Sequence, residues 1–171
     1  TDFTVNSSTG AITVNHIDYE RQSQYSLVVF ARDNGVPSRQ GYALVDIVIT
    51  DVNDNPPIIS PSMYHVNISE AALVGTELIT VKATDGDSGL NGKLVYSIVG
   101  GNDGSKFGIN ADTGVISLSG NLDYDGSNIT YTLTIAVHDN FGMSASTNAT
   151  VIINVFDVND NQPVFDLNEY T

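Results

Sequence analysis

The same acidic stretch, closed by proline, occurs twice in this sequence, 106 residues apart. Residues 51–57 read Asp-Val-Asn-Asp-Asn-Pro-Pro, and residues 157–163 read Asp-Val-Asn-Asp-Asn-Gln-Pro. Aspartate and asparagine offer the oxygen ligands that Ca²⁺ takes in sets of six to eight. The closing proline fixes its own backbone and favours an extended conformation in the residue before it. We therefore interpret each copy as a calcium-binding linker between two similar domains.

The segments around these linkers repeat at nearly the same spacing, which indicates tandem units. Three pairs of segments correspond: 3–14 with 107–118, 25–33 with 131–139, and 57–64 with 163–170. The order predicts the C-terminal part of one repeat in residues 1–52, a complete repeat in 53–158, and the start of a third in 159–171. Half a repeat leaves an apolar sheet face uncovered, so we expect this sequence to be an interior piece of a longer protein.

The complete unit shows the two-residue alternation of half-buried strands, as in Tyr64, Val66 and Ile68. The Asn91–Gly92 pair is a strong turn signal between two such segments. The segments with strand character are 64–68, 78–83, 93–98, 107–109, 115–118, 130–137 and 147–156. No helical period is present. About seven short strands in about 100 residues predict an all-β protein of tandem seven-stranded Greek-key, immunoglobulin-like sandwiches.

The composition narrows the class of partner. Acidic residues outnumber basic ones by 20 to 6, giving a formal charge of −14, which argues against binding nucleic acid or an anionic membrane surface. Hydrophobic residues make up 41% of the chain, so it can bury a core, unlike a disordered acidic tail. Without cysteine, neither a disulfide framework nor a thiolate metal site can form.

Several motifs, in order and at the repeat period, resemble cadherin repeats over the whole chain. They are the two linkers, Asp-Tyr-Glu at 18–20, Ser-Glu-Ala at 69–71, Ala-Thr-Asp-Gly-Asp-Ser-Gly-Leu-Asn-Gly at 83–92, and Asp139. Residues 31–37, Ala-Arg-Asp-Asn-Gly-Val-Pro, are more similar to protocadherin, Fat or Dachsous repeats than to the strand-swapping type. The resemblance implies calcium-dependent cell–cell adhesion by the ectodomain of a single-pass plasma-membrane protein. The implied partner is another cadherin, bound homophilically or heterophilically.

The resemblance also implies two sets of Ca²⁺ ligands. The first junction would use Asp18, Glu20, Asp51, Asn53, Asp54, Asp85, Asp87, the carbonyl of Asn91, and Asp139. The second would use Glu70, Asp123, Asp125, Asp157, Asn159 and Asp160. One expected glutamate would precede Thr1, so the ion nearest the first repeat should be weakened. Asp125 stands where a glutamate is usual and is shorter by one methylene, so its bidentate reach to the ion is either lost or compensated by a shift of the backbone.

Repulsion between carboxylates is the physical reason why we expect Ca²⁺ to fix the relative orientation of the repeats. Two carboxylates about 4 Å apart repel by about 1 kcal/mol in bulk water and by about 4 kcal/mol at an effective dielectric of 20. With five or six carboxylates at a junction, the linker should flex without metal. With Ca²⁺ bridging the two repeats, their relative orientation should become fixed.

Other metal sites and enzyme sites fit the sequence less well. An EF-hand loop starting at Asp51 would need glycine and glutamate where Pro56 and Ser62 stand. The pair Asp85 and Asp87 could serve glycoside hydrolysis. The acids are too many, however, and lie at domain ends, so we expect no enzyme. A passive calcium-stiffened extracellular tether, or an accessory domain of a secreted hydrolase, remains an alternative to an adhesive protein.

Four sequons for N-linked glycosylation occur, and in an extracellular protein they make some glycan an expected feature. Their asparagines are Asn6, Asn67, Asn128 and Asn148.

Overall fold

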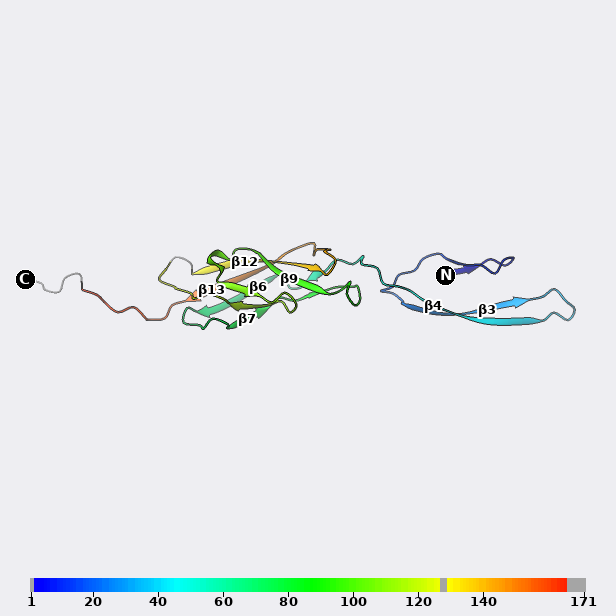
Figure 1. The fold of residues 1–171 in the computed structure, drawn as a ribbon, viewed down its shortest axis with the longest axis horizontal. Coiled ribbons are helices and arrows are strands. Elements are labelled where there is room, and N and C mark those ends of the chain that lie inside the picture. Colours follow the sequence, from blue (N-terminus) through cyan, green and yellow to red (C-terminus); the bar gives the residue numbers. More distant parts are fainter. Residues whose placement is uncertain (1, 127–128, 166–171) are drawn as a thin grey trace, which may run out of the picture.

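The computed structural model describes residues 2–126 and 129–165. The described chain is built of strands, with a single 3-10 turn, η1 (Asp103–Ser105). Its two folded parts lie end to end along one long axis (Figure 1). Within the described residues, no helix is long and apolar enough to cross a membrane. The prediction of an all-β fold is confirmed.

A sandwich of two sheets forms the larger part. One sheet has the order β6-β13-β12-β9 and the other β10-β11-β7, with β13 parallel to β6 and the remaining pairs antiparallel. The bounds are β6 (Met63–Ser69), β7 (Glu77–Thr80), β9 (Leu94–Gly100), β10 (Phe107–Ile109), β11 (Val115–Leu118), β12 (Thr130–Asp139) and β13 (Ala149–Phe156). These are the seven strands that the alternation predicts.

The core of the sandwich follows that alternation. On β12, Leu133 and Ile135 are fully buried, whereas Thr132, which precedes Leu133, is exposed on the opposite side of the strand. Residues of both sheets join in one cluster, and Phe107 of β10 meets Tyr131 of β12 edge to face at 5.0 Å. Burying each large aliphatic side chain contributes about 1.5–3 kcal/mol, so this cluster is the main source of stability.

One predicted strand is interrupted. The segment 78–83 is observed as β7 and a short β8 (Ala83–Thr84), which pairs with β5 (Ile58–Ile59). Between them, the backbone N–H groups bond outside the sheet: that of Val81 to the Gly114 carbonyl at 2.9 Å, and that of Lys82 to the Tyr64 hydroxyl at 2.9 Å. These bonds replace the ladder there, which sequence periodicity cannot reveal.

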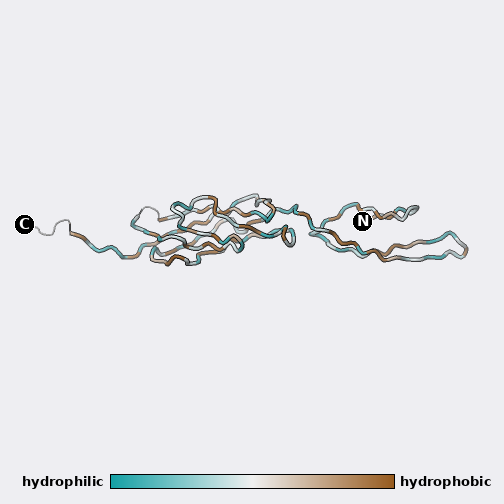
Figure 2. Tube along the Cα trace, viewed as in Figure 1, coloured by the Kyte–Doolittle hydropathy of each residue, from teal (hydrophilic) through white to brown (hydrophobic). Residues whose placement is uncertain are grey.

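The smaller part consists of two hairpins, β1 (Phe3–Val5) with β2 (Ile12–Val14) and β3 (Gln24–Arg32) with β4 (Gln40–Val48). Phe3 packs edge to face on Tyr25 at 4.9 Å, and Tyr25 is the buried hydrophobic residue of these hairpins. Figure 2 shows hydrophobic segments running along both β3 and β4. This part therefore buries far less apolar surface than the sandwich.

Candidate metal centre between the two parts

Three chain segments meet where the smaller part joins the sandwich. One carboxylate oxygen each from Glu20, Asp51 and Asp87 lie within 4.8 Å of one another. Glu20 comes from the loop between β2 and β3, Asp51 from the linker after β4, and Asp87 from the loop between β8 and β9. The structure thus brings together residues that lie far apart in the sequence.

Four oxygens at this junction are buried and accept no hydrogen bond: Asp51 Oδ1, Asn53 Oδ1, Asp85 Oδ2 and Asp139 Oδ2. Asp139 is completely buried. A buried acceptor without a donor costs free energy, and a buried charge costs more. Divalent cations bound at this junction would supply the missing partners. Because the donors are carboxylate and amide oxygens without imidazole or thiolate, the set fits Ca²⁺.

In Asp139 and Asp51, one carboxylate oxygen is held by hydrogen bonds from the protein, and the other is buried without a donor. Asp139 Oδ1 accepts the backbone N–H groups of Phe141 at 2.8 Å and Met143 at 2.9 Å. Asp51 Oδ2 accepts from the Ser88 backbone N–H at 2.9 Å, the Ser88 hydroxyl at 3.2 Å and the Asn91 amide at 3.1 Å. The unpartnered oxygen of each residue is therefore fixed in position before any ion binds.

The loop that carries Asp85 and Asp87 is tightly packed against the linker. The Asn55 side-chain amide donates to Asp87 Oδ1 at 2.8 Å, and the Asn55 backbone N–H donates to Oδ2 at 3.2 Å. A β-carbon on Gly92 would lie 2.2 Å from the Asp87 carbonyl oxygen, so only glycine fits there. The turn signal at Asn91–Gly92 thus also reports this close backbone approach.

The pKa values of Asp85, in this loop, and Asp139, beside it, shift in opposite directions. Burial raises the pKa of Asp85 above its ordinary value, and the negative charges of Asp87 and Asp139 add to that rise. Burial also acts to raise the pKa of Asp139, but the nearby Asn53 amide and the backbone N–H of Met143 outweigh it and keep that pKa low. Of these two carboxylates, Asp85 is therefore the one whose charged form is disfavoured without a cation.

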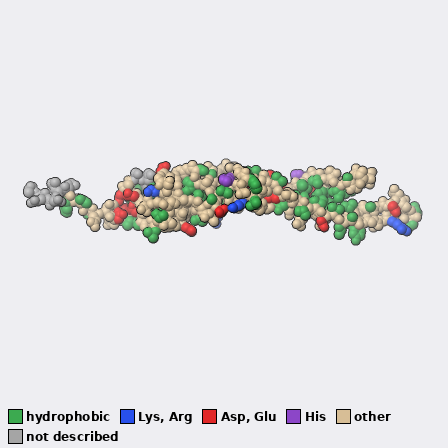
Figure 3. Space-filling view, viewed as in Figure 1, with side chains coloured by type: hydrophobic (Ala, Val, Ile, Leu, Met, Phe, Trp, Pro, Cys, Tyr) green, Lys and Arg blue, Asp and Glu red, His purple; other side chains and the backbone are tan. Residues whose placement is uncertain are grey.

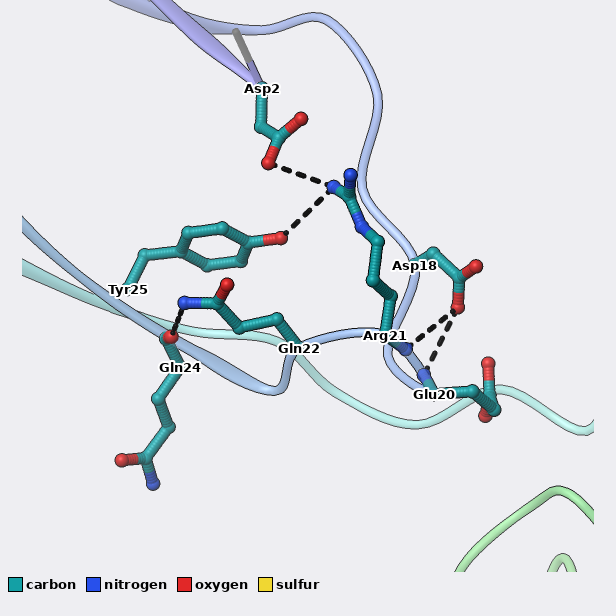
Figure 4. A network of polar contacts seen from close by, with 7 residues as sticks. All are labelled: Asp2, Asp18, Glu20, Arg21, Gln22, Gln24 and Tyr25. Carbon is teal, nitrogen blue, oxygen red and sulfur yellow. Dashed lines mark hydrogen bonds and ion pairs between the residues drawn. The ribbon is translucent and has the colours of Figure 1, made fainter.

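The smaller part contributes Asp18 and Glu20 from one turn, shown in Figure 4. Asp18 Oδ1 accepts from the backbone N–H groups of Glu20 at 3.0 Å and Arg21 at 3.3 Å. The Arg21 guanidinium in turn pairs with Asp2 at 2.8 Å and donates to the Tyr25 hydroxyl at 3.4 Å. Asp54 lines a shallow cleft together with Asp18 and Glu20, so this linker residue faces the smaller part.

The second junction gathers its predicted residues at the other end of the sandwich. Glu70 is buried and accepts from the backbone N–H groups of Tyr124 and, at 2.7 Å, Val158. Burial raises the pKa of Asp125, and four neighbouring carboxylates raise it further: Asp157, Glu70, Asp160 and Asp123. Asp157, Asn159 and Asp160 line one cleft with Asp125, and the Asn161 amide donates to Asp125. Within the described part of the chain, the 4.8 Å triad belongs to the first junction.

Two residues at the first junction were missed by the sequence analysis. Ser88 donates to Asp51, and its hydroxyl also lies 3.0 Å from the Tyr19 hydroxyl, which joins the sandwich to the smaller part. Both lie inside the quoted motifs, but serine and tyrosine carry no ligand signal of their own. The Asn91 side chain, which donates to Asp51, was likewise expected only through its carbonyl.

The sequon asparagines fall into three situations. Asn67 and Asn148 are exposed on the sandwich. Asn6 is exposed too, and its Oδ1 accepts the backbone N–H groups of Ser8 and Thr9. Asn128 lies outside the described residues. Glycan occupancy stays a prediction at all four.

Comparisons with known proteins agree on one family. The cadherin domain model matches residues 1–50 and 64–156. The chain is 40% identical over 171 residues to human Protocadherin Fat 1, covering 99% of this chain and 4% of that protein. It is 40% identical over 155 residues to mouse Protocadherin Fat 4, covering 91% of this chain and 3% of that protein. The chain thus spans a few per cent of the length of these relatives.

Solved structures show the same fold. Mouse Cadherin-23 EC22-24 matches with a TM-score of 0.79 and 38% identity, over 92% of this chain and 51% of that one. The Protocadherin gammaB7 EC3-6 cis-dimer structure matches with a TM-score of 0.82 and 29% identity, over 94% of this chain and 40% of that one.

Proposed function

Because the chain belongs to the cadherin family, we propose that it is a segment of a calcium-dependent cell-adhesion ectodomain. Ca²⁺ at each linker holds neighbouring repeats in a fixed relative orientation. The observation that carries this proposal is the set of four buried oxygens without donors, drawn from the linker, the loop after β8 and the end of β12. Bound there, the ion supplies positive charge that offsets carboxylate repulsion.

At the first junction, we assign the ligands to three groups of residues. The smaller part contributes Asp18 and Glu20. The linker contributes Asp51, Asn53 and Asp54. The sandwich contributes Asp85, Asp87, the Asn91 carbonyl and Asp139. The second junction uses Glu70, Asp123, Asp125, Asp157, Asn159 and Asp160. We retain the repeat boundaries at residues 1–52, 53–158 and 159–171, which are consistent with the matched ranges 1–50 and 64–156.

The relatives support an extracellular, membrane-anchored parent protein whose partner is another cadherin. Protocadherin gammaB7 forms a cis-dimer according to its structure. The family contains adhesion receptors, which favours a non-enzymatic role. Calcium-dependent aggregation of beads that carry the full ectodomain tests adhesion directly. Aggregation that calcium promotes and chelator reverses is expected.

Beads that stay dispersed at millimolar calcium would instead support a passive tether that binds no partner. A catalytic domain in the parent reading frame would point to an accessory domain of a hydrolase. In both alternatives, calcium binding at the linkers persists, so calorimetric titration of the same protein separates loss of adhesion from loss of the metal site.

A further inference from the structure

The β3–β4 hairpin has a second apolar face, opposite the one that carries Tyr25. Its members are Val28, Phe30, Tyr42, Leu44 and Val48, each between 52% and 72% exposed. The strand register places Phe30 opposite Tyr42 and Val28 opposite Leu44, so these four form one contiguous surface. We name these five residues the outer face. Figure 3 shows hydrophobic side chains gathered over this hairpin.

Completing the repeat does not cover the outer face. In the sandwich, β12 and β13 gain β9 and β6 at their edges, and the opposing sheet packs on the side of Tyr131 and Leu133. Tyr25 matches Tyr131, so an opposing sheet would pack on the Tyr25 side of β3. Strands added at the free edges of β3 and β4 would extend the sheet sideways. The outer face would remain exposed to solvent in a complete repeat.

The repeat architecture does not require an apolar surface here either. At the corresponding positions of the sandwich, the five residues are Thr134, Ala136, Asn148, Thr150 and Asn154. That surface is polar, and Asn148 is a sequon that a glycan could occupy. The apolar outer face is therefore a property of this one repeat, and a contiguous exposed patch of this kind marks an interaction site.

Two charges at the ends of the outer face indicate its partner. Arg32 follows Phe30 at one end, while Asp46 lies beyond Leu44 toward the other end and accepts a hydrogen bond from Ser26 at 2.7 Å. Asp46 lies opposite Ser26, six residues from Arg32 along β3. Arg32 and Asp46 are therefore about 20 Å apart along the strands, too far to pair within one chain. Within residues 2–126 and 129–165, neither forms a salt bridge.

We propose that the outer face packs against the outer face of a second copy of this chain, with β3 antiparallel to its counterpart. A two-fold axis that runs between the two faces, perpendicular to the strands, reverses the strand direction in the second copy. Arg32 of each copy therefore lies near Asp46 of the other. This self-complementarity is the requirement of an isologous interface and favours a second copy over an unrelated protein.

The contact is weak. Two strands of this length present roughly 300 Å², whereas stable complexes bury about 800 Å² per partner. Phe30 and Tyr42 are the aromatic residues that would supply most of the binding free energy. The choice of partner rests on the proposed adhesive function, in which many weak contacts act together along a membrane.

Sedimentation equilibrium of the full chain in calcium, over a range of concentrations, tests the proposal. Arg32→Asp or Asp46→Arg places like charges at both ends of the dimer, so each should raise the dimer dissociation constant more than about tenfold. The double variant restores opposite charges and should regain most of the affinity. Phe30→Ser should also weaken the dimer. Val99→Ser, which alters an exposed valine on the sandwich, should leave it unchanged.

Three results would overturn the inference: a chain that stays monomeric even at about 1 mM, a dimer insensitive to the single reversals, or a double variant as weak as the singles. Calorimetric titration with Ca²⁺ separates this outcome from that of the proposed function. Normal calcium binding with an insensitive dimer defeats the inference alone. Absent calcium binding with the expected dimer behaviour defeats the calcium-dependent function alone.

Discussion

Asp139 shows how a single carboxylate can serve both the fold and a cation. Its Oδ1 accepts two backbone N–H groups, from Phe141 and Met143, whereas its buried Oδ2 accepts none. The hydrogen bonds stabilise the charged form and fix the side-chain orientation. A residue arranged in this way can bind an ion without first reorganising.

Replacing Asp139 by asparagine keeps the shape and one acceptor but removes the charge. We expect Asp139→Asn to weaken calcium binding at the first junction more than about tenfold, since a charged ligand is lost from a buried site. Calorimetric titration measures this change. Asp33→Asn is the matched control, because Asp33 makes similar backbone hydrogen bonds to Gly35 and Arg39 at the far end of β3. Equal affinities in the two variants would remove Asp139 from the ligand set.

The Asp2–Arg21 pair gives a prediction for pH. The hydrogen bond from Arg21 is the largest cause that holds the pKa of Asp2 below its ordinary value. The folded pKa is therefore below the unfolded one, so the pair stabilises the fold above the ordinary pKa and loses this effect as pH falls through the folded value. The effect should be small because the pair is solvent-exposed.

Asp2→Asn should accordingly flatten the dependence of the melting temperature on pH in the acid range. Thermal unfolding followed by circular dichroism, from pH 5 to about pH 2, measures it. Asp112→Asn, which breaks the exposed pair with Lys93 on the sandwich, is a control for the loss of any surface ion pair. An unchanged slope for Asp2→Asn would show that the pair contributes nothing to the stability of the smaller part.

At the scale of the element, alternation predicted the strands that bury one face. The clearest case is β12, where Tyr131, Leu133 and Ile135 point inward as the two-residue period requires. The break between β7 and β8 could not be predicted, because it depends on the Tyr64 hydroxyl and the Gly114 carbonyl, which are distant in the sequence. The outer face could not be predicted, because an uninterrupted apolar run such as that in β3 is equally typical of a strand that is buried on both sides.

Truncating a core residue of β12 should destabilise the sandwich without affecting the ligands directly. Leu133 is fully buried, so Leu133→Ala should lower the free energy of unfolding by about 2–5 kcal/mol through lost burial and the cavity left behind. Denaturant unfolding in calcium measures the change. Thr132→Ala, on the solvent-exposed side of the same strand, should lower the free energy of unfolding by less than about 1 kcal/mol. Similar losses in both variants would contradict the assigned inner face.

At the scale of the molecule, the repeated linker predicted where the carboxylates gather. The acidic motifs identified residues such as Glu20, Asp51 and Asp87, which the fold brings within 4.8 Å. The sequence could not predict which oxygen of each carboxylate is left without a donor, nor the bond between Ser88 and Tyr19 that spans the junction. Both depend on how separate loops approach each other, which has no local signal.

The junction also indicates where bending begins when the metal is removed. Asp51 and Asn55 bind the loop of the sandwich through several hydrogen bonds that need no ion. By contrast, the hydrogen bond between the Ser88 and Tyr19 hydroxyls joins the loop of Asp18 and Glu20 to the sandwich through two exposed side chains. The linker should therefore stay docked on the sandwich while the smaller part moves.

The distance across the first junction tests the central claim most directly. The chain has no cysteine, so Gln40→Cys and Ala111→Cys introduce two exposed sites for spin labels, one on each part. Pulsed electron resonance then gives the distribution of label distances. The account predicts one narrow distribution at millimolar calcium and a broad one in chelator. Distributions of equal width in the two conditions would contradict it.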